Sequence, residues 1–281
     1  MIKDITIGQF FPGSSPIHKL DPRAKILILL VYIITLFLVK NFFSLLLLFL
    51  FSFICVLISK ISAKSVWKSI RALIFIVIFT AVLQIVYNKN GTVLLKPFPQ
   101  FDFCITSGGV FTAVFLVLRI IALILLSSLL TYTTSPTMLT DAIERLLSPL
   151  KLFHIKVHSL AMMMTIALRF IPTLIREIDI IMSAQKARGA KLDAGKFGER
   201  IKALISVFVP LFVSSFRRAA ELAVAMECRC YTDGANRSRL KVMRFALRDY
   251  LAFFICAVIF AGALVVNYVP LCQSLLFERV I

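Results

Sequence analysis

Two arginines have the residue type and spacing that best fit a binding role. Each closes a long helical stretch in the pattern Ala-x-x-x-Arg, from Ala184 to Arg188 and from Ala225 to Arg229. A guanidinium group is permanently charged, and its planar fork of donors fits a carboxylate or a row of backbone carbonyls. A single arginine at a helix end often just complements the helix dipole. Two such endings on paired helices favour a role in which each arginine enters a groove of a soluble partner.

The neighbours of these arginines are predicted to shape the two helix ends. Ala187 and Gly189 flank the first arginine, and Gly189 tolerates a break in the helix. Glu227 is predicted to hold the second arginine in place. Cys228 and Cys230 lie two residues apart, so their thiols point apart on a helix, and no further ligand pair is near. We therefore predict no metal site there.

Motifs for catalysis are absent from the sequence. We find no Walker A loop, no GxGxxG or GxSxG motif, and no acidic cluster of the kind found in membrane phosphotransferases. His154 and His158 lie four residues apart without an HExxH glutamate, so they are interpreted as interfacial residues. No Asp or Glu lies inside an apolar run, which disfavours a proton- or sodium-driven carrier. Arg119 interrupts one apolar run and should face protein or the membrane interface.

A polar segment, GQFFPGSSPIHKLDPRAK, precedes the first apolar run. Its candidate structural residues are Pro12, Gly13, His18, Asp21, Pro22 and Arg23. Asp21 is predicted to cap the following helix, while Arg23 and Lys25 are predicted to contact lipid headgroups. The alternative is a fixed polar elbow that braces the charged part of the chain.

The elements that position these residues must lie in a membrane. Of the 281 residues, 60% are apolar and 16% are charged, and the mean hydropathy is +0.94, which makes a soluble enzyme very unlikely. A spanning helix needs about 20 mostly apolar residues. The sequence predicts an all-α, polytopic membrane protein with about five spans, at 24–40, 42–59, 71–87, 108–132 and 250–269.

Unlike the apolar spans, residues 133–248 are predicted to form charged amphipathic helices. The first helix, 137–149, is predicted to present Leu139, Ile143 and Leu147 on one face, with Glu144 among the charges opposite. Two longer helices follow at about 156–188 and 197–231. Each opens with an apolar half that contains a proline, Pro172 or Pro210. These halves are short for a span and suit a helix at the interface or packed under a membrane domain.

The net charge of +18 follows the positive-inside pattern. Residues 133–248 contain 19 Lys or Arg and nine Asp or Glu, and the loop 60–71 contains four basic residues and no acid. Placing both on the cytoplasmic side predicts an inside N-terminus, five spans and an outside C-terminus. The predicted organisation is an N-terminal segment 1–23, four spans in 24–132, a cytoplasmic domain 133–248, and a last span with the C-terminus in 249–281. No nucleic-acid partner is needed to explain the charge.

Three motifs in this order resemble the transmembrane T component of energy-coupling factor (ECF) transporters. PGSSPIHKLDPRAK is similar to the N-terminal motif of that family, and AQKARGA and AMECRCY are similar to its two short arginine motifs. The resemblance covers essentially the whole length. The second arginine motif departs from the family, because Cys228 and Cys230 stand where Ala and Gly are usual.

The resemblance implies a scaffold in the bacterial cell membrane that joins two cytoplasmic ABC-type ATPases to a small substrate-binding membrane subunit, the S component. Arg188 would enter a groove of one ATPase and Arg229 a groove of the other. The S component would be held by the apolar residues of the three amphipathic helices, Leu139, Ile143, Leu147, Pro172 and Pro210. ATP and Mg²⁺ would bind the ATPases, so this chain would bind no cofactor and would not be an enzyme.

Other functions compete with this one. The N-terminal motif resembles the shared kind of T component, which serves several vitamin-binding S components, and the alternative is a T component dedicated to cobalt or nickel. From other classes, a secondary transporter acting alone and a membrane lipid enzyme are the further alternatives. The substrate is expected to be set by another subunit.

Overall fold

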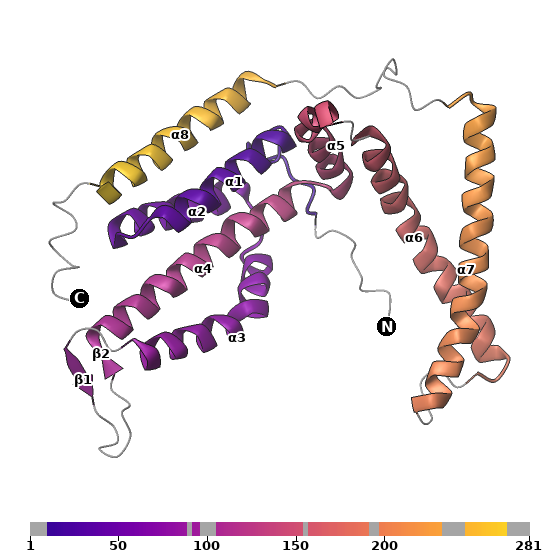
Figure 1. Ribbon diagram of the computed structural model, residues 1–281, viewed down its shortest axis with the longest axis horizontal. Coiled ribbons are helices and arrows are strands. Elements are labelled where there is room, and N and C mark those ends of the chain that lie inside the picture. The colour runs from indigo at the N-terminus through magenta and orange to yellow at the C-terminus, as the bar shows by residue number, and fades with distance from the viewer. Residues whose placement is uncertain are drawn as a thin grey trace. The chain divides into compact units, whose positions relative to one another are not determined.

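The computed structural model describes residues 10–88, 92–95, 105–153, 157–190, 197–231 and 245–268. The chain forms two compact units, shown in Figure 1. The arginine unit consists of residues 136–242 with 1–7, and the membrane unit consists of residues 8–135 and 243–281. Within the described residues the fold is helical apart from one short strand pair, which confirms the predicted all-α class.

The membrane unit is built from long apolar helices. They are α1 (Pro22–Leu38), α2 (Phe42–Ser59), α3 (Ala63–Tyr87), α4 (Ser107–Thr133) and α8 (Leu247–Tyr268). Between α3 and α4, β1 (Val93–Leu95) pairs antiparallel with β2 (Ile105–Thr106), in the register Val93 to Thr106 and Leu95 to Ile105. The predicted spans therefore correspond to five helices with shifted ends.

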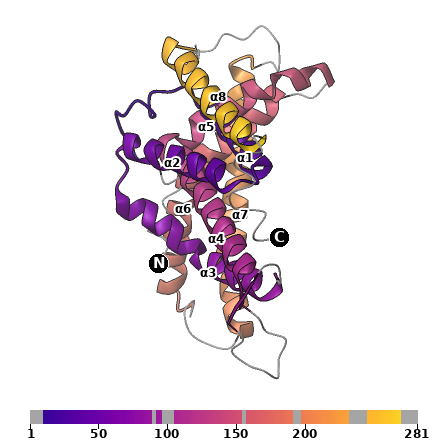
Figure 2. The ribbon, with the colours of Figure 1, turned by 90° about the vertical axis from the view of Figure 1, so that its left-hand side faces the viewer.

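Helix α4 is central to the membrane unit, because it packs against α1, α2 and α3, while α8 packs against α1 and α2 (Figures 1 and 2). Aromatic rings join α1, α2 and α8, since Tyr32 lies 5.8 Å from Phe260 and Phe51 lies 5.7 Å from Phe260 between ring centroids. Large apolar side chains on the outer faces of α2, α3 and α8 are exposed, as a lipid-facing surface requires.

Polar contacts join the ends of α8 to the ends of α1. The backbone N–H of Asp21 donates to Asp249 at the start of α8. At the other end, Oδ1 of Asn267 accepts from the N–H groups of Lys40 and Asn41, at 2.9 and 3.1 Å. Helices α1 and α8 therefore run parallel, each beginning at the same end of the unit.

Lys25, in the first turn of α1, contacts the C-terminal end of α4. Its Nζ donates to the carbonyl of Thr133, the last residue of α4, at 3.0 Å. The end of α4 and the starts of α1 and α8 therefore lie at one end of the membrane unit. The chain leaves that unit and re-enters it on the same side.

Six of the described helices are long and apolar enough to cross a membrane, namely α2, α3, α4, α6, α7 and α8. Four of these match predicted spans, and α1, with 17 residues, lies at the lower limit of spanning length. The third span begins at Ala63 and not at 71, because Ser62 caps it by accepting from the N–H of Ser65. Most of the predicted basic loop 60–71, from Ala63 onward, therefore belongs to the first three turns of α3.

The arginine unit contains α5 (Pro136–Leu146), a 3₁₀ turn η1 (Ser148–Phe153), α6 (Val157–Ala187) and α7 (Phe197–Cys228). Helix α5 packs on α6, and α6 packs on α7. The two long helices confirm the predicted stretches, and Pro172 and Pro210 lie inside them without ending them. The first helix is shorter than predicted, because α5 ends at Leu146 and Pro149 lies within the 3₁₀ turn.

Candidate functional site

Helix α6 ends in a Schellman motif that places Arg188 at the helix C-cap. The N–H of Ala190 donates to the carbonyl of Gln185, and the N–H of Gly189 donates to the carbonyl of Lys186, both at 3.0 Å. Gly189 has φ +88°, the left-handed conformation that this motif requires. The last turn of α6 is thereby closed by the backbone alone, and the Arg188 side chain is exposed.

Helix α7 ends in the same way around Arg229. The N–H of Tyr231 donates to the carbonyl of Met226 at 3.0 Å, and the N–H of Cys230 donates to the carbonyl of Glu227 at 2.9 Å. Cys230 has φ +52° and is the counterpart of Gly189. Arg188 and Arg229 therefore occupy the same position of the same motif. The repeated Ala-x-x-x-Arg pattern of the sequence corresponds to a repeated backbone geometry.

The two guanidinium groups are available for a partner. Both arginines are exposed, and among the described residues neither side chain has an ion-pair partner. The predicted bond from Glu227 to Arg229 is not formed, because residues two apart on a helix face in different directions. Ala187, Glu227 and Cys228 are exposed beside these ends, and contact with an ATPase stays a prediction for all of them.

The left-handed conformation of Cys230 leads to a testable prediction, because a side chain makes that conformation higher in free energy. We expect Cys230→Gly to relieve about 1–2 kcal/mol of strain and to lose about 0.5–1 kcal/mol to unfolded-chain entropy. The net stabilisation is then roughly 0.5–1 kcal/mol, measured as slower hydrogen exchange, relative to the intrinsic rate, of the N–H groups at positions 230 and 231. As a matched control, Cys228→Gly puts glycine inside the last turn of α7 and should speed this exchange. Faster exchange in Cys230→Gly would contradict the prediction.

The N-terminal motif forms a fixed turn before α1. Nε2 of His18 lies 3.1 Å from the carbonyl of Phe11, and Nδ1 lies 2.6 Å from Oγ of Ser15. A carbonyl can only accept, so Nε2 carries the proton and Ser15 donates to Nδ1. The His18 ring covers Gly13 so closely that a Cβ there would lie 2.7 Å from it. Burial lowers the pKa of His18 below its ordinary value of 6.5, against the hydrogen bond to Phe11, which raises it; the neutral tautomer fits this direction.

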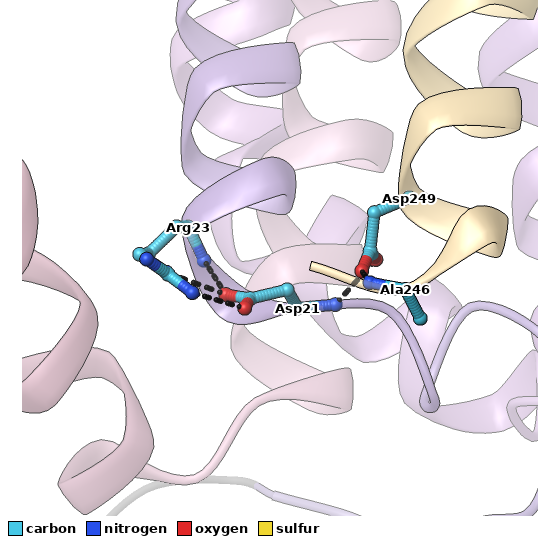
Figure 3. Close-up of polar contacts among 4 residues, drawn as sticks. All are labelled: Asp21, Arg23, Ala246 and Asp249. Atoms are coloured by element: carbon cyan, nitrogen blue, oxygen red, sulfur yellow. Dashed lines mark hydrogen bonds and ion pairs between the residues drawn. The ribbon is translucent and has the colours of Figure 1, made fainter. Parts of the chain in front are cut away.

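Asp21 and Asp249 tie the start of α1 to the start of α8 (Figure 3). Asp21 caps α1 as predicted, because its Oδ1 accepts from the N–H of Arg23 at 2.9 Å. Asp249 is 2% exposed. Its Oδ1 accepts from the N–H of Asp21 and its Oδ2 from the N–H of Ala246, both at 2.8 Å. Asp249 thus reaches back to cap its own helix, as in a capping box, and also holds the cap of α1.

The side chains of Arg23 and Lys25, for which headgroup contacts were predicted, make contacts within the fold. Arg23 pairs with Asp21 at 2.8 Å, and its guanidinium lies 4.3 Å above the Phe245 ring. Lys25 is buried, and its Nζ is bound to the last carbonyl of α4. Helix α1 begins at Pro22, so Arg23 and Lys25 lie in its first turn, beside Phe245 and the end of α4. The motif therefore forms a fixed polar elbow that ties α1 to α4 and α8, while bracing of the charged part of the chain stays a prediction.

Helix α5 differs from its predicted faces. Glu144, predicted on the charged outer face, is buried and lies 3.0 Å from Nδ1 of His158 on α6. Leu139 and Ile143 are half-buried, and Leu147 is exposed. The amphipathic pattern could not reveal that a polar group would be drawn inward by a histidine 14 residues away. His154 lies outside the described residues.

The apolar surface of the long helices is concentrated on α7. Phe208, Phe212 and Phe216 follow each other at helical spacing, with ring centroids 5.8 and 4.7 Å apart. They are exposed by 61, 52 and 62% and are called the phenylalanine stripe below. Pro172 and Pro210 are also exposed. The prolines alone do not predict this surface, whereas the i, i+4, i+8 spacing of the three phenylalanines is the sequence signal that indicates the stripe.

Arg119 lies within α4 and faces protein, as predicted. Its Nη2 donates to the carbonyl of Val39 at 2.5 Å, and its guanidinium lies 4.7 Å from the Phe115 ring. In the part of the chain that the structure describes, no three His, Cys, Asp or Glu side chains come together as a metal site would need.

Comparison with known proteins gives these features a family. Residues 13–241 match the CbiQ family, described as cobalt transport protein. The chain belongs to this family. Within it, the chain is 48% identical over 260 residues to the energy-coupling factor transporter transmembrane protein EcfT of Clostridium kluyveri, covering 92% of this chain and 95% of that protein. The EcfT of Ruminiclostridium cellulolyticum is 46% identical over 269 residues, 96% of this chain and 99% of that protein.

The match also extends to the EcfT of Bacillus subtilis, which is 41% identical over 249 residues, 89% of this chain and 93% of that protein. The CbiQ match and these EcfT relatives confirm the resemblance to a T component of an ECF transporter. With its apolar helices, this EcfT-type chain is a multi-pass membrane protein and a transporter component.

Proposed function

We propose that this T component joins two ABC-type ATPase subunits to one S component and transmits the movement of the ATPases to it. The observation that carries the proposal is the matched pair of helix ends. The same backbone bonds close α6 and α7 and leave Arg188 and Arg229 exposed beyond them. Two equivalent cationic ends suit two similar grooves, whose carboxylates or carbonyls would accept the guanidinium donors. ATP and Mg²⁺ would bind the ATPases, and this chain would be non-catalytic and bind no cofactor.

The proposed setting is the bacterial cell membrane, with the N-terminus inside. Residues 133–248, with 19 Lys or Arg, would lie in the cytoplasm under the positive-inside rule. The parallel course of α1 and α8 supports this arrangement, because the chain leaves and re-enters the membrane unit at one end. Lys64, Lys68 and Arg71 in the first turns of α3 would lie on that same side.

Helices α6 and α7 would lie outside the hydrocarbon core in this proposal. The longest stretch of α7 without Lys, Arg, Asp or Glu is 203–216, and that of α6 is 157–168. At 1.5 Å per residue these cover roughly 21 and 18 Å, against a hydrocarbon core of about 30 Å. Their apolar halves therefore suit contact with another membrane subunit.

The phenylalanine stripe would be the main contact for the S component. Three neighbouring exposed rings form the kind of apolar surface that soluble proteins rarely leave uncovered. Pro172, Pro210 and Leu147 are exposed as well, and half-buried Leu139 and Ile143 would contribute from α5. An apolar membrane subunit packs on such rings without needing charged partners.

For the transport substrate we propose vitamins or similar micronutrients, delivered by interchangeable S components. The EcfT relatives and the N-terminal motif support this shared kind of module. A T component dedicated to cobalt or nickel is the second candidate, because the matching family is described as cobalt transport protein. The identity of the S components that bind this chain would separate the two.

The test is co-purification of the tagged chain from cells that also express the two ATPases and the S components of the same organism. We expect two different ATPases and one S component per chain by native mass spectrometry, with ATP hydrolysis by the complex. Phe212→Glu places a charge in the middle of the phenylalanine stripe. It should release the S component and retain both ATPases, because burying an unpaired carboxylate is costly.

Glu221→Gln, a change at an exposed residue of α7, is the control and should keep all subunits. A wild-type chain that binds no ATPase would overturn the proposal. Retention of the S component by Phe212→Glu would overturn only the role of the phenylalanine stripe and leave the rest of the proposal standing. Co-purification of several vitamin-binding S components would favour the shared module over one dedicated to a metal.

A further inference from the structure

One carboxylate of α6 holds two groups of α7. Oε2 of Glu177 lies 3.0 Å from Nη2 of Arg218, and Oγ of Ser214 donates a short hydrogen bond to Oε1 of the same carboxylate. Ser214 and Arg218 are four residues apart, so they lie on one face of α7. The side chains of Glu177 and Arg218 are 18 and 33% exposed, which makes this a partly buried contact.

The contact lies at matched positions of the two helices. Glu177 precedes Arg188 by 11 residues, and Arg218 precedes Arg229 by 11 residues. At 1.5 Å per residue each arm is about 16 Å long. Figure 1 shows α6 and α7 crossing, with the end of α7 directed away from the end of α6. The two arginine ends therefore extend in different directions from one contact, each about 16 Å along its helix.

The contact restrains sliding of one helix along the other. A carboxylate bound by two groups on successive turns of the partner helix has to leave both before either helix can slip. Both ends of the contact are side chains from helix interiors, with no loop residue involved. Such a contact would pass movement of one arginine end on to the other through the two helices.

We propose that Glu177 and Arg218 form the pivot at which α6 and α7 cross, and that they position Arg188 and Arg229 for coordinated binding to two ATPases. They are positioning residues, because neither belongs to the arginine ends or to the phenylalanine stripe. The coupling role rests on the proposed function, whereas the pivot itself is a property of this chain alone. The pivot and its coupling role can therefore be tested by two separate measurements.

The first measurement needs no partner. Spin labels at Ser183 and Val224, both exposed and each six residues beyond the pivot, report the distance between the two arms in the full chain in nanodiscs, after the native cysteines are replaced by serine. We expect a narrow distance distribution in the wild type and a clearly broader one in Glu177→Gln. Glu221→Gln should leave it narrow. An unchanged width in Glu177→Gln would overturn the pivot.

The second measurement is uptake per ATP hydrolysed by the reconstituted complex. Glu177→Gln should keep all subunits bound, since both arginines remain, and should lower this ratio by about tenfold. The exchanged pair Glu177→Arg with Arg218→Glu restores an ion pair and should recover most of it, which also guards against misfolding of the single variant. An unchanged ratio in Glu177→Gln, or no recovery in the exchanged pair despite a narrow label distance, would overturn the coupling role. A wild-type chain that binds no ATPase would instead refute the proposed function and leave the label result standing.

Discussion

Reversing both helix-end charges, Arg188→Glu with Arg229→Glu, is expected to release both ATPases from the detergent-solubilised complex and to abolish uptake. Removing one partner of a buried, hydrogen-bonded charge pair costs about 2–5 kcal/mol, and reversal adds repulsion in a groove that accepts a cation. Each single variant should lose one contact and keep the other. Uptake should therefore fall further in the double variant than in either single one. The measurement is co-purification of the subunits together with uptake into vesicles.

The chain contains a matched control for this experiment. Arg176 and Arg217 are exposed arginines on the same helices, each 12 residues before the terminal arginine. Reversing both of them changes the net charge by the same amount but leaves the helix ends intact, so the ATPases should stay bound. A double helix-end variant that co-purifies and transports like the wild type would refute the role of the arginines. Equal losses in the control pair would show a general effect of charge.

Asp249→Ala is expected to destabilise the membrane unit strongly. The change leaves the buried N–H group of Asp21 and the part-buried N–H group of Ala246 without their acceptor. Each unsatisfied donor costs about 1–3 kcal/mol, so the loss is roughly 2–4 kcal/mol. In detergent, the Tm of the purified chain should fall by roughly 5–10 °C.

Two further variants test whether the loss of Tm comes from the lost acceptor oxygens. Asp249→Asn keeps one acceptor oxygen but turns an amide donor towards the other N–H, so its Tm should lie between those of Asp249→Ala and the wild type. Glu221→Ala removes an exposed acid from α7 and should leave the Tm within about 1 °C. A wild-type Tm for Asp249→Ala would mean that the elbow does not depend on this carboxylate.

The helices were predictable because each is specified locally. Uninterrupted apolar runs of spanning length leave few alternatives in a membrane, and the fourth span was predicted within one residue at each end. The third was not, because its first three turns carry Lys64, Lys68 and Arg71, which were interpreted as a loop. A helix that starts outside the hydrocarbon can carry such side chains at no cost, so charge alone was a poor guide to where it begins.

The arginine ends were found from sequence, but their equivalence was not. The Ala-x-x-x-Arg spacing located Arg188 and Arg229, while the shared capping motif appears only in the backbone, where Cys230 takes the conformation of Gly189. Asp249, the partner that fixes the elbow, and the pivot were missed for another reason. Asp21 and Asp249 are 228 residues apart, and Glu177 meets Ser214 only after two helices cross. Partner choice over such separations depends on tertiary packing, which local patterns do not encode.

The interleaved chain of the membrane unit sets an order for its biogenesis. Helix α8 supplies both Asp249 and Asn267, which hold the two ends of α1, yet α8 begins only at Leu247. At about 5–20 residues per second, a ribosome needs on the order of 10 s to translate from the end of α4 to α8. During that time the elbow lacks its buried carboxylate. The first helix to enter the membrane must therefore wait for the last before its ends are fixed, and a chain truncated before Asp249 would offer quality-control proteases an unfinished elbow.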